Sequence, residues 1–118
     1  MLRVSRFIGG VDDVRWCWES DEVPAYVIVD TLIRDFERYE EYKKLARPIA
    51  ERYGGEYLVR GADIDLVDDQ LWTPTRVVIL RFPDRETARR FLDSDEYAPI
   101  KAMRNEHADS TLFIVEGD

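Results

Sequence analysis

The order of strand-like and helix-like segments constrains this chain more than any other feature. Four runs rich in β-branched and aromatic residues lie at 25–30, 56–60, 76–82 and 111–116. Two charged segments, with apolar residues three or four positions apart, follow the first and third of these runs. This is the order strand, helix, strand, strand, helix, strand, and it predicts an α+β domain.

Both helical segments carry recognisable start and stop signals. Asp35 and Asp84 each stand where a side chain caps a helix, and Gly54 is placed to end the first helix in a left-handed conformation. Pro48 is expected to kink the first helix. Residues 93–96 have capping-box spacing and are expected to restart the second helix at a new angle. The buried stripe predicted for the first helix comprises Phe36, Tyr39, Tyr42, Ala46, Ile49, Ala50 and Tyr53.

The segment between the second and third strands alternates apolar and acidic residues. Over residues 63–69 this alternation predicts an extension of the second strand with one wet face, turning at 68–70. Residues 72–74 are then expected to re-enter the sheet. The four aspartates lack the glycine and glutamate placement of a calcium loop, so we predict no metal site here.

Connection rules turn this order into a specific fold. A βαββαβ chain is expected to form a ferredoxin-like, four-stranded antiparallel sheet with both helices on one face. The other face carries large apolar residues from every strand, which a monomer rarely leaves in water. We therefore predict a homodimer in which two sheets pack face to face as a dimeric α/β barrel.

Composition narrows the function classes. The chain of 118 residues carries a formal net charge of −8, which disfavours nucleic acid and anionic membranes as partners. Its single cysteine and single histidine exclude a disulfide framework and the common multi-histidine zinc sites. No stretch approaches the roughly 20 apolar residues that span a bilayer. We expect a cytoplasmic protein without a cofactor.

The most suggestive polar residues are cations next to aromatic rings. Tyr97, Lys101 and Arg104 share one helix face, and Arg60 and Arg76 stand at the ends of neighbouring strands. Guanidinium groups beside rings suit a small ligand that carries a carboxylate. The alternative is ordinary ion pairing on a solvated rim. The predicted binding residues are Arg60, Trp72, Arg76, Tyr97, Lys101, Arg104 and Tyr39.

Two residues are candidate proton carriers. Asp30 ends the first strand on a partly apolar face, where burial would raise the pKa of its carboxyl group. The alternative is that Asp30 accepts hydrogen bonds from a backbone N–H or an arginine. His107 is the second catalytic candidate, and the alternative is that it stabilises the end of its helix.

Several blocks of this sequence resemble the domain of unknown function 1330 family. They are residues 25–30 (AYVIVD), 39–42 (YEEY), 53–61 (YGGEYLVRG), 72–83 (WTPTRVVILRFP), 94–97 (SDEY) and 115–117 (VEG). The resemblance implies a dimeric α/β barrel of ferredoxin-like subunits. The wider fold group includes cofactor-free monooxygenases, dehalogenase-like proteins and stress-response proteins, while the family itself has no settled activity.

The chain departs from the family pattern at three places. Phe36 stands where the family often has proline, and Arg81 stands where an acid is expected. Residues 1–23 form an N-terminal extension outside the family match, and residues 24–118 form the domain. Val23 stands where the family's first methionine would be, so a GTG start codon at this position is an alternative to a start at Met1.

Three hypotheses for function follow. The first is a homodimer that binds an anionic or aromatic small molecule, and the second is a cofactor-independent monooxygenase or isomerase. The third is a non-catalytic dimerisation module. A pocket of roughly 300 Å³ lined by the predicted residues would favour the first two. A filled interior with every arginine paired outward would exclude them.

Overall fold

A computed structural model describes residues 23–61 and 63–117 of the chain. The predicted N-terminal extension lies outside these residues, except for Val23. The helices and strands are β1 (Ala25–Ile33), α1 (Phe36–Arg52), β2 (Glu56–Arg60), β3 (Val77–Phe82), α2 (Arg85–Leu92), α3 (Ala98–His107) and β4 (Ala108–Glu116).

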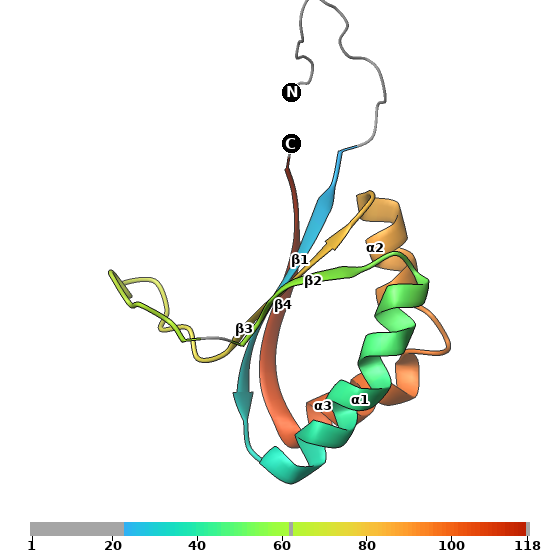
Figure 1. Cartoon of the computed structure of the whole chain (residues 1–118). Helices are drawn as coiled ribbons and strands as arrows, with labels where there is room; N and C mark the ends of the chain where they lie inside the picture. Colours follow the sequence, from blue (N-terminus) through green and yellow to red (C-terminus); the bar gives the residue numbers. More distant parts are fainter. Residues whose placement is uncertain (1–22, 62, 118) are drawn as a thin grey trace, which may run out of the picture.

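The four strands form one antiparallel sheet in the order β2-β3-β1-β4. The helices cover one face of the sheet, which we call the inner face (Figure 1). This arrangement confirms the predicted ferredoxin-like α+β fold. Strands β1 and β4 are longer than the apolar runs suggested, since they pair along the whole length of β1 from Ala25 to Ile33.

The predicted helix signals are confirmed at three positions. The Asp35 carboxylate accepts the Arg38 N–H at 3.1 Å, and the Asp84 carboxylate accepts the Thr87 N–H at 2.7 Å. Gly54 has a φ of 91°, the left-handed conformation that ends α1. Helix α1 continues through Pro48 as far as Arg52.

Two details of the helices differ from the predictions. Phe36 is the first residue of α1 and is 71% exposed. It therefore does not join the buried stripe. The second helix does restart, but α3 begins at Ala98 rather than at residues 93–96. The capping box expected at residues 93–96 is not the contact observed. The Ser94 hydroxyl accepts a hydrogen bond from the Tyr97 N–H at 3.1 Å. The Glu96 carboxylate pairs with Arg52 of α1.

Strand alternation places the core and the site on the inner face. Ala25, Val27, Val29 and Thr31 of β1 are buried under the helices. Phe82 of β3 stacks on Phe91 of α2 with 5.6 Å between the ring centroids. The other face is not covered by any described residue of a helix, and we call it the open face (Figure 1).

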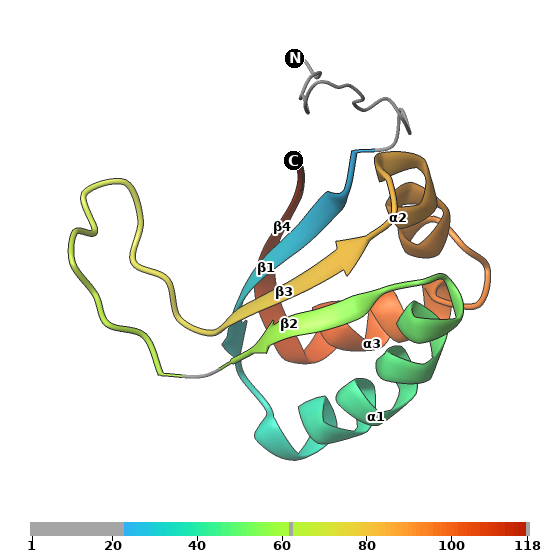
Figure 2. The same ribbon diagram turned by 45° about the horizontal axis from the view of Figure 1, so that its top comes forward.

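The predicted strand extension after β2 is wrong. The described residues between Gly61 and Arg76 form no strand, and residues 63–74 form a long arm (Figure 2). The arm projects on the side of the sheet opposite the helices (Figure 1). Alternation of apolar and acidic residues alone does not make a strand, because the backbone of a strand needs a neighbouring segment for its hydrogen bonds. Val67 and Leu71 of the arm are 91% and 87% exposed.

Candidate functional site

A hollow lies between the inner face of the sheet and helices α1, α2 and α3. Its free volume is about 60 Å³. Among the described residues that line it, five are cations and four are tyrosines, and none is an aspartate or glutamate. The chain as a whole has 25 acids and 17 basic residues, so this composition is a strong local reversal of charge. The charged and phenolic lining residues are Tyr39, Tyr42, Lys43, Arg47, Tyr57, Arg60, Arg76, Tyr97 and Arg104.

The floor of the hollow is a buried Tyr–Arg pair from α3 and the turn before it. Arg104 is 6% exposed, and its Nη1 donates to the Tyr97 hydroxyl at 3.1 Å. The Tyr97 and Tyr42 hydroxyls share a hydrogen bond of 2.8 Å. Packing against Phe91, with 4.5 Å between ring centroids, fixes the Tyr97 ring.

The charge of Arg104 is not compensated within the described part of the chain. No carboxylate of these residues forms an ion pair with its guanidinium, and the buried Nε finds no hydrogen-bond partner there. A buried, unpaired cation is costly, and buried polar groups in native proteins nearly always have partners. The unpaired Nε of Arg104 is therefore an exception to this rule.

The tyrosines around Arg104 stay neutral and do not balance its charge. Burial, with the nearby Tyr42 as the next cause, raises the pKa of Tyr97 far above its ordinary value. The same two causes raise the pKa of Tyr57 to about 12 and also raise the pKa of Tyr39. At neutral pH these hydroxyls can donate or accept hydrogen bonds, and the hollow keeps its net positive charge.

A β-bulge brings Tyr57 and Arg60 into the hollow together. Tyr57 lies opposite Leu80, while Val59 lies opposite Ile79, so Leu58 is the extra residue in β2. The bulge puts Tyr57 and Arg60 on the inner face although three positions separate them. The Arg60 guanidinium lies 5.3 Å from the centre of the Tyr57 ring, within the range of a cation–π contact.

Arg76 enters the hollow from the residue before β3. Its guanidinium lies 5.4 Å from the centre of the Tyr39 ring, after passing Gly61. A Cβ atom on Gly61 would meet the Arg76 Nε at 2.7 Å, and Gly61 has a φ of 76°. Both constraints explain the glycine at this position.

Asp30 and Trp72 lie away from the hollow. The Asp30 carboxylate accepts the N–H groups of Thr75 and Arg76, at 2.8 and 3.0 Å, and the Trp72 Nε1 at 2.9 Å. Partial burial works to raise the pKa of Asp30, but these hydrogen bonds outweigh it and hold the pKa below its ordinary value. The expected rise in this pKa is therefore wrong. Asp30 anchors the base of the arm, as the alternative interpretation proposed.

Lys101 and His107 also lie outside the hollow. Lys101 is exposed on α3, one turn before Arg104. The His107 Nε2 lies 3.5 Å from Glu106, and the His107 carbonyl accepts the N–H groups of Arg34 and Asp35. Of the nine residues predicted for the site, the structure thus brings together Tyr39, Arg60, Arg76, Tyr97 and Arg104.

Sequence reasoning missed four of the charged and phenolic residues that line the hollow, namely Tyr42, Lys43, Arg47 and Tyr57. Lys43 and Arg47 follow Tyr39 at intervals of four residues on α1, which is a readable signal for one helix face. Tyr57 had no such signal, because its orientation depends on the bulge. The described residues hold no cluster of three or more histidine, cysteine, aspartate or glutamate side chains that could bind a metal ion. None of the helices in these ranges is long and apolar enough to cross a membrane.

Comparisons with solved structures agree on the fold. A protein of unknown function from Rhodopseudomonas palustris is 19% identical, with 83% of this chain and 86% of that chain aligned and a TM-score of 0.66. A hypothetical protein from Arabidopsis thaliana is 13% identical over 83% and 93% of the two chains, with a TM-score of 0.59. SnoaB, a cofactor-independent oxygenase from Streptomyces nogalater, is 14% identical over 84% and 95%, with a TM-score of 0.53.

Identities this low establish a common fold and nothing more specific. No curated protein matches the sequence. The family comparison is more decisive, because the model of the domain of unknown function DUF1330 matches residues 24–118, which is most of the chain. The chain belongs to the DUF1330 family.

Proposed function

We propose that this protein is a homodimer that binds a small organic anion in the hollow between the sheet and the helices. One observation carries the proposal. Arg104 is buried, lines the hollow and meets no carboxylate in the described residues, and its Nε lacks a hydrogen-bond partner among them. An anion with at least one planar acid group would supply the missing charge and acceptor.

The size of the hollow limits how the ligand is held. The free volume of the hollow is about 60 Å³. It is smaller than the roughly 300 Å³ set as the criterion for a complete ligand pocket. The inner hollow therefore fits an acid group and a few attached atoms. The rest of the ligand would extend between the tyrosines towards the surface.

The dimer is proposed from the open face of the sheet. This face presents apolar residues from all four strands, among them Ile28 of β1, Val59 of β2, Ile79 of β3 and Phe113 of β4. Leu32 and Val115 on the same face are 53% and 43% exposed. A second copy packed face to face would remove this surface from water. The arm lies on the same side of the sheet, where it would contact that copy (Figure 1).

A cofactor-independent oxygenase is the second candidate. SnoaB, which has this activity, shares the fold. In an enzyme of this kind the same cations would stabilise negative charge that develops on the substrate, because fixed donors in a dry site act strongly on such charge. Isomerisation through an anionic intermediate would use the hollow in the same way. If the protein served only as a dimerisation module, the burial of Arg104 without a counter-ion would have no explanation.

Calorimetric titration with benzoate tests the proposed binding. The wild-type protein should bind benzoate, and Arg104→Met should weaken binding at least tenfold, since hydrogen bonds to a charged group contribute about 1.5–3 kcal/mol. Lys101→Met is the matched control, because it removes the same charge from the same helix outside the hollow. We expect this control to stay within twofold of the wild type.

Two results would contradict the proposal. One is the absence of benzoate binding by the folded wild-type protein, and the other is equal loss of affinity in the Arg104 and Lys101 variants. Native mass spectrometry of the same samples reports the proposed dimer mass independently of the titration. A monomer at all micromolar concentrations would refute the dimer.

A further inference from the structure

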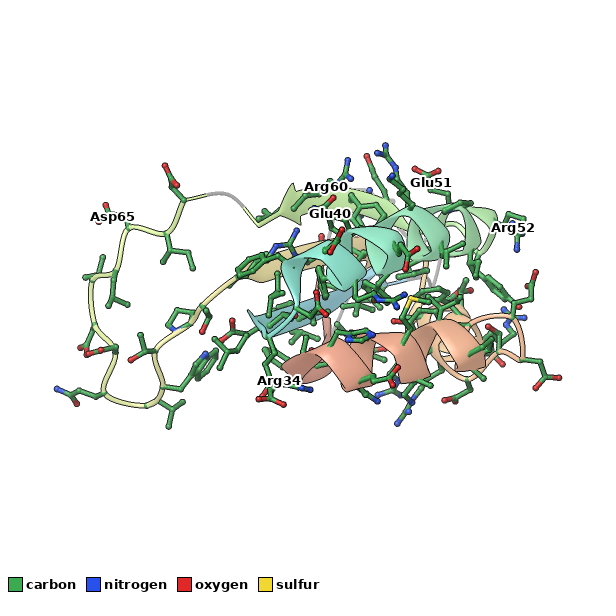
Figure 3. All side chains as sticks on the ribbon, turned by 90° about the horizontal axis from the view of Figure 1, so that it is seen from below. Arg34, Glu40, Glu51, Arg52, Arg60 and Asp65 are labelled. Carbon is green, nitrogen blue, oxygen red and sulfur yellow. The ribbon has the colours of Figure 1, made fainter. Side chains whose placement is uncertain are left out.

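A second space with cationic lining adjoins the hollow at the surface. A depression of about 350 Å³ runs along α1 beside β2. It shares Lys43, Arg47 and Arg60 with the inner hollow, so the two spaces adjoin at these residues. Figure 3 shows Arg60 on β2 together with Glu40 and Glu51 along the neighbouring α1.

The ion pairs at this opening leave Lys44 and Arg60 without a carboxylate partner among the described residues, and of these two only Arg60 also lines the inner hollow. Lys43 pairs with Glu40 at 2.9 Å, and Arg47 pairs with Glu51 at 3.0 Å. Arg60 forms no ion pair with any carboxylate of the described residues, and it is exposed to solvent. Its described contact is the face of the Tyr57 ring, at 5.3 Å. The guanidinium therefore keeps its donors free for a second anion.

Aromatic side chains line the inner hollow and not the described part of the depression. Arg76 and Arg104 line the inner hollow and do not line the described part of the depression. The hollow is also lined by Tyr39, Tyr42 and Tyr57, with 5.1 Å between the centroids of the Tyr39 and Tyr42 rings. Ring faces and edges of this kind favour a flat apolar or aromatic group.

We propose that the ligand is a dianion whose two acid groups stand at opposite ends of a flat, aromatic body. This inference rests on the proposed function, and it adds the second acid group and the shape of the body. The inner acid group pairs with Arg104, and the outer one pairs with Arg60. A protein with a net charge of −8 repels a dianion at long range, so the local cations have to supply the selectivity.

The test compares two probes that differ in one acid group. Terephthalate carries carboxylates at opposite ends of a benzene ring, and p-toluate has a methyl group in place of one of them. At 0.15 M salt the wild-type protein should bind terephthalate at least tenfold more tightly than p-toluate. Arg60→Met should reduce this affinity ratio to about one, and Arg60→Lys should restore part of it, because it returns the charge without the planar fork.

The variants also separate this inference from the proposed function. Arg104→Met should weaken binding of both probes, while the control Lys101→Met should keep the wild-type ratio. Equal wild-type affinities for the two probes, or a ratio that survives Arg60→Met, would overturn the dianion and leave the single-anion site standing. Failure of both probes to bind the folded wild-type protein would overturn both proposals. Circular dichroism of each variant confirms that the exposed Arg60 was replaced without unfolding.

Discussion

Replacing Arg104 with methionine should make the free protein more stable. Truncating a residue that is 6% exposed usually destabilises a protein, so the expected sign is unusual. It follows from the surroundings of this guanidinium, which has no carboxylate partner in the described residues. Methionine keeps most of the aliphatic packing of arginine and removes the buried charge.

The magnitude follows from two opposing contributions. Burying an ion still costs several kcal/mol after the protein relaxes, and we take about 4 kcal/mol. The hydrogen bond to the Tyr97 hydroxyl, at 3.1 Å, returns about 2 kcal/mol, while the contact with the Asn105 side chain, at 3.5 Å, returns little. The variant should gain about 2 kcal/mol. For a domain of this size the gain raises Tm by about 8 °C.

Thermal unfolding followed by circular dichroism, without added ligand, measures this difference. Arg34→Met serves as the control, because the Arg34 guanidinium donates to the Asn105 and Ala108 carbonyls and pairs with Asp109. Removing it should lower Tm by a few degrees. If Arg104→Met also lowers Tm by more than about 4 °C, the guanidinium stabilises the free protein, and the argument for a waiting anion site fails.

Three further predictions follow from the structure. Gly61→Ala should destabilise the domain by about 1–2 kcal/mol, because alanine tolerates a φ of 76° poorly, and its Cβ displaces Arg76; denaturant unfolding and benzoate titration measure the two effects. Since the pKa of Asp30 is lowered on folding, its contribution to stability is complete above the unfolded pKa of about 3.9 and is lost as pH falls through the folded value. Asp30→Asn should remove this acid-dependent part of the stability profile. Ile79→Asp should give a monomer in light scattering, whereas a dimer that tolerates an aspartate opposite Ile28 would refute packing through the open face.

Local signals in the sequence were sufficient to predict the order of the elements. Asp35, Asp84 and Gly54 each act within one turn of the chain, so their neighbours in sequence determine what they do. Local signals gave a wrong prediction for the arm, residues 63–74. Its alternating residues match a strand, but pairing depends on which segments lie beside it in space. Asp30, over 40 residues away, accepts the backbone N–H groups at its base.

The candidate site was predictable where one helix face or a strand end defined it. Tyr97 and Arg104 lie seven residues apart, close to two helical turns, and their side chains meet in a hydrogen bond. Asp30 and Trp72 also meet, yet on the other side of the sheet from the hollow. Composition could not separate these two groups, because both combine a charge with an aromatic ring. The two groups lie on opposite sides of the sheet, and the side on which a residue lies depends on the strand register.

The pairing of Tyr57 with Arg60 shows how much depends on one register shift. In a regular strand, side chains three positions apart point to opposite faces, so only one of the two could line the hollow. The extra residue, Leu58, reverses this outcome. Residues 56–60 contain no glycine that would signal a bulge, but β2 is an edge strand, where bulges are common. The arrangement of an outer cation on an aromatic wall is therefore a consequence of the position of β2 in the sheet, and it could be inferred only after the fold was known.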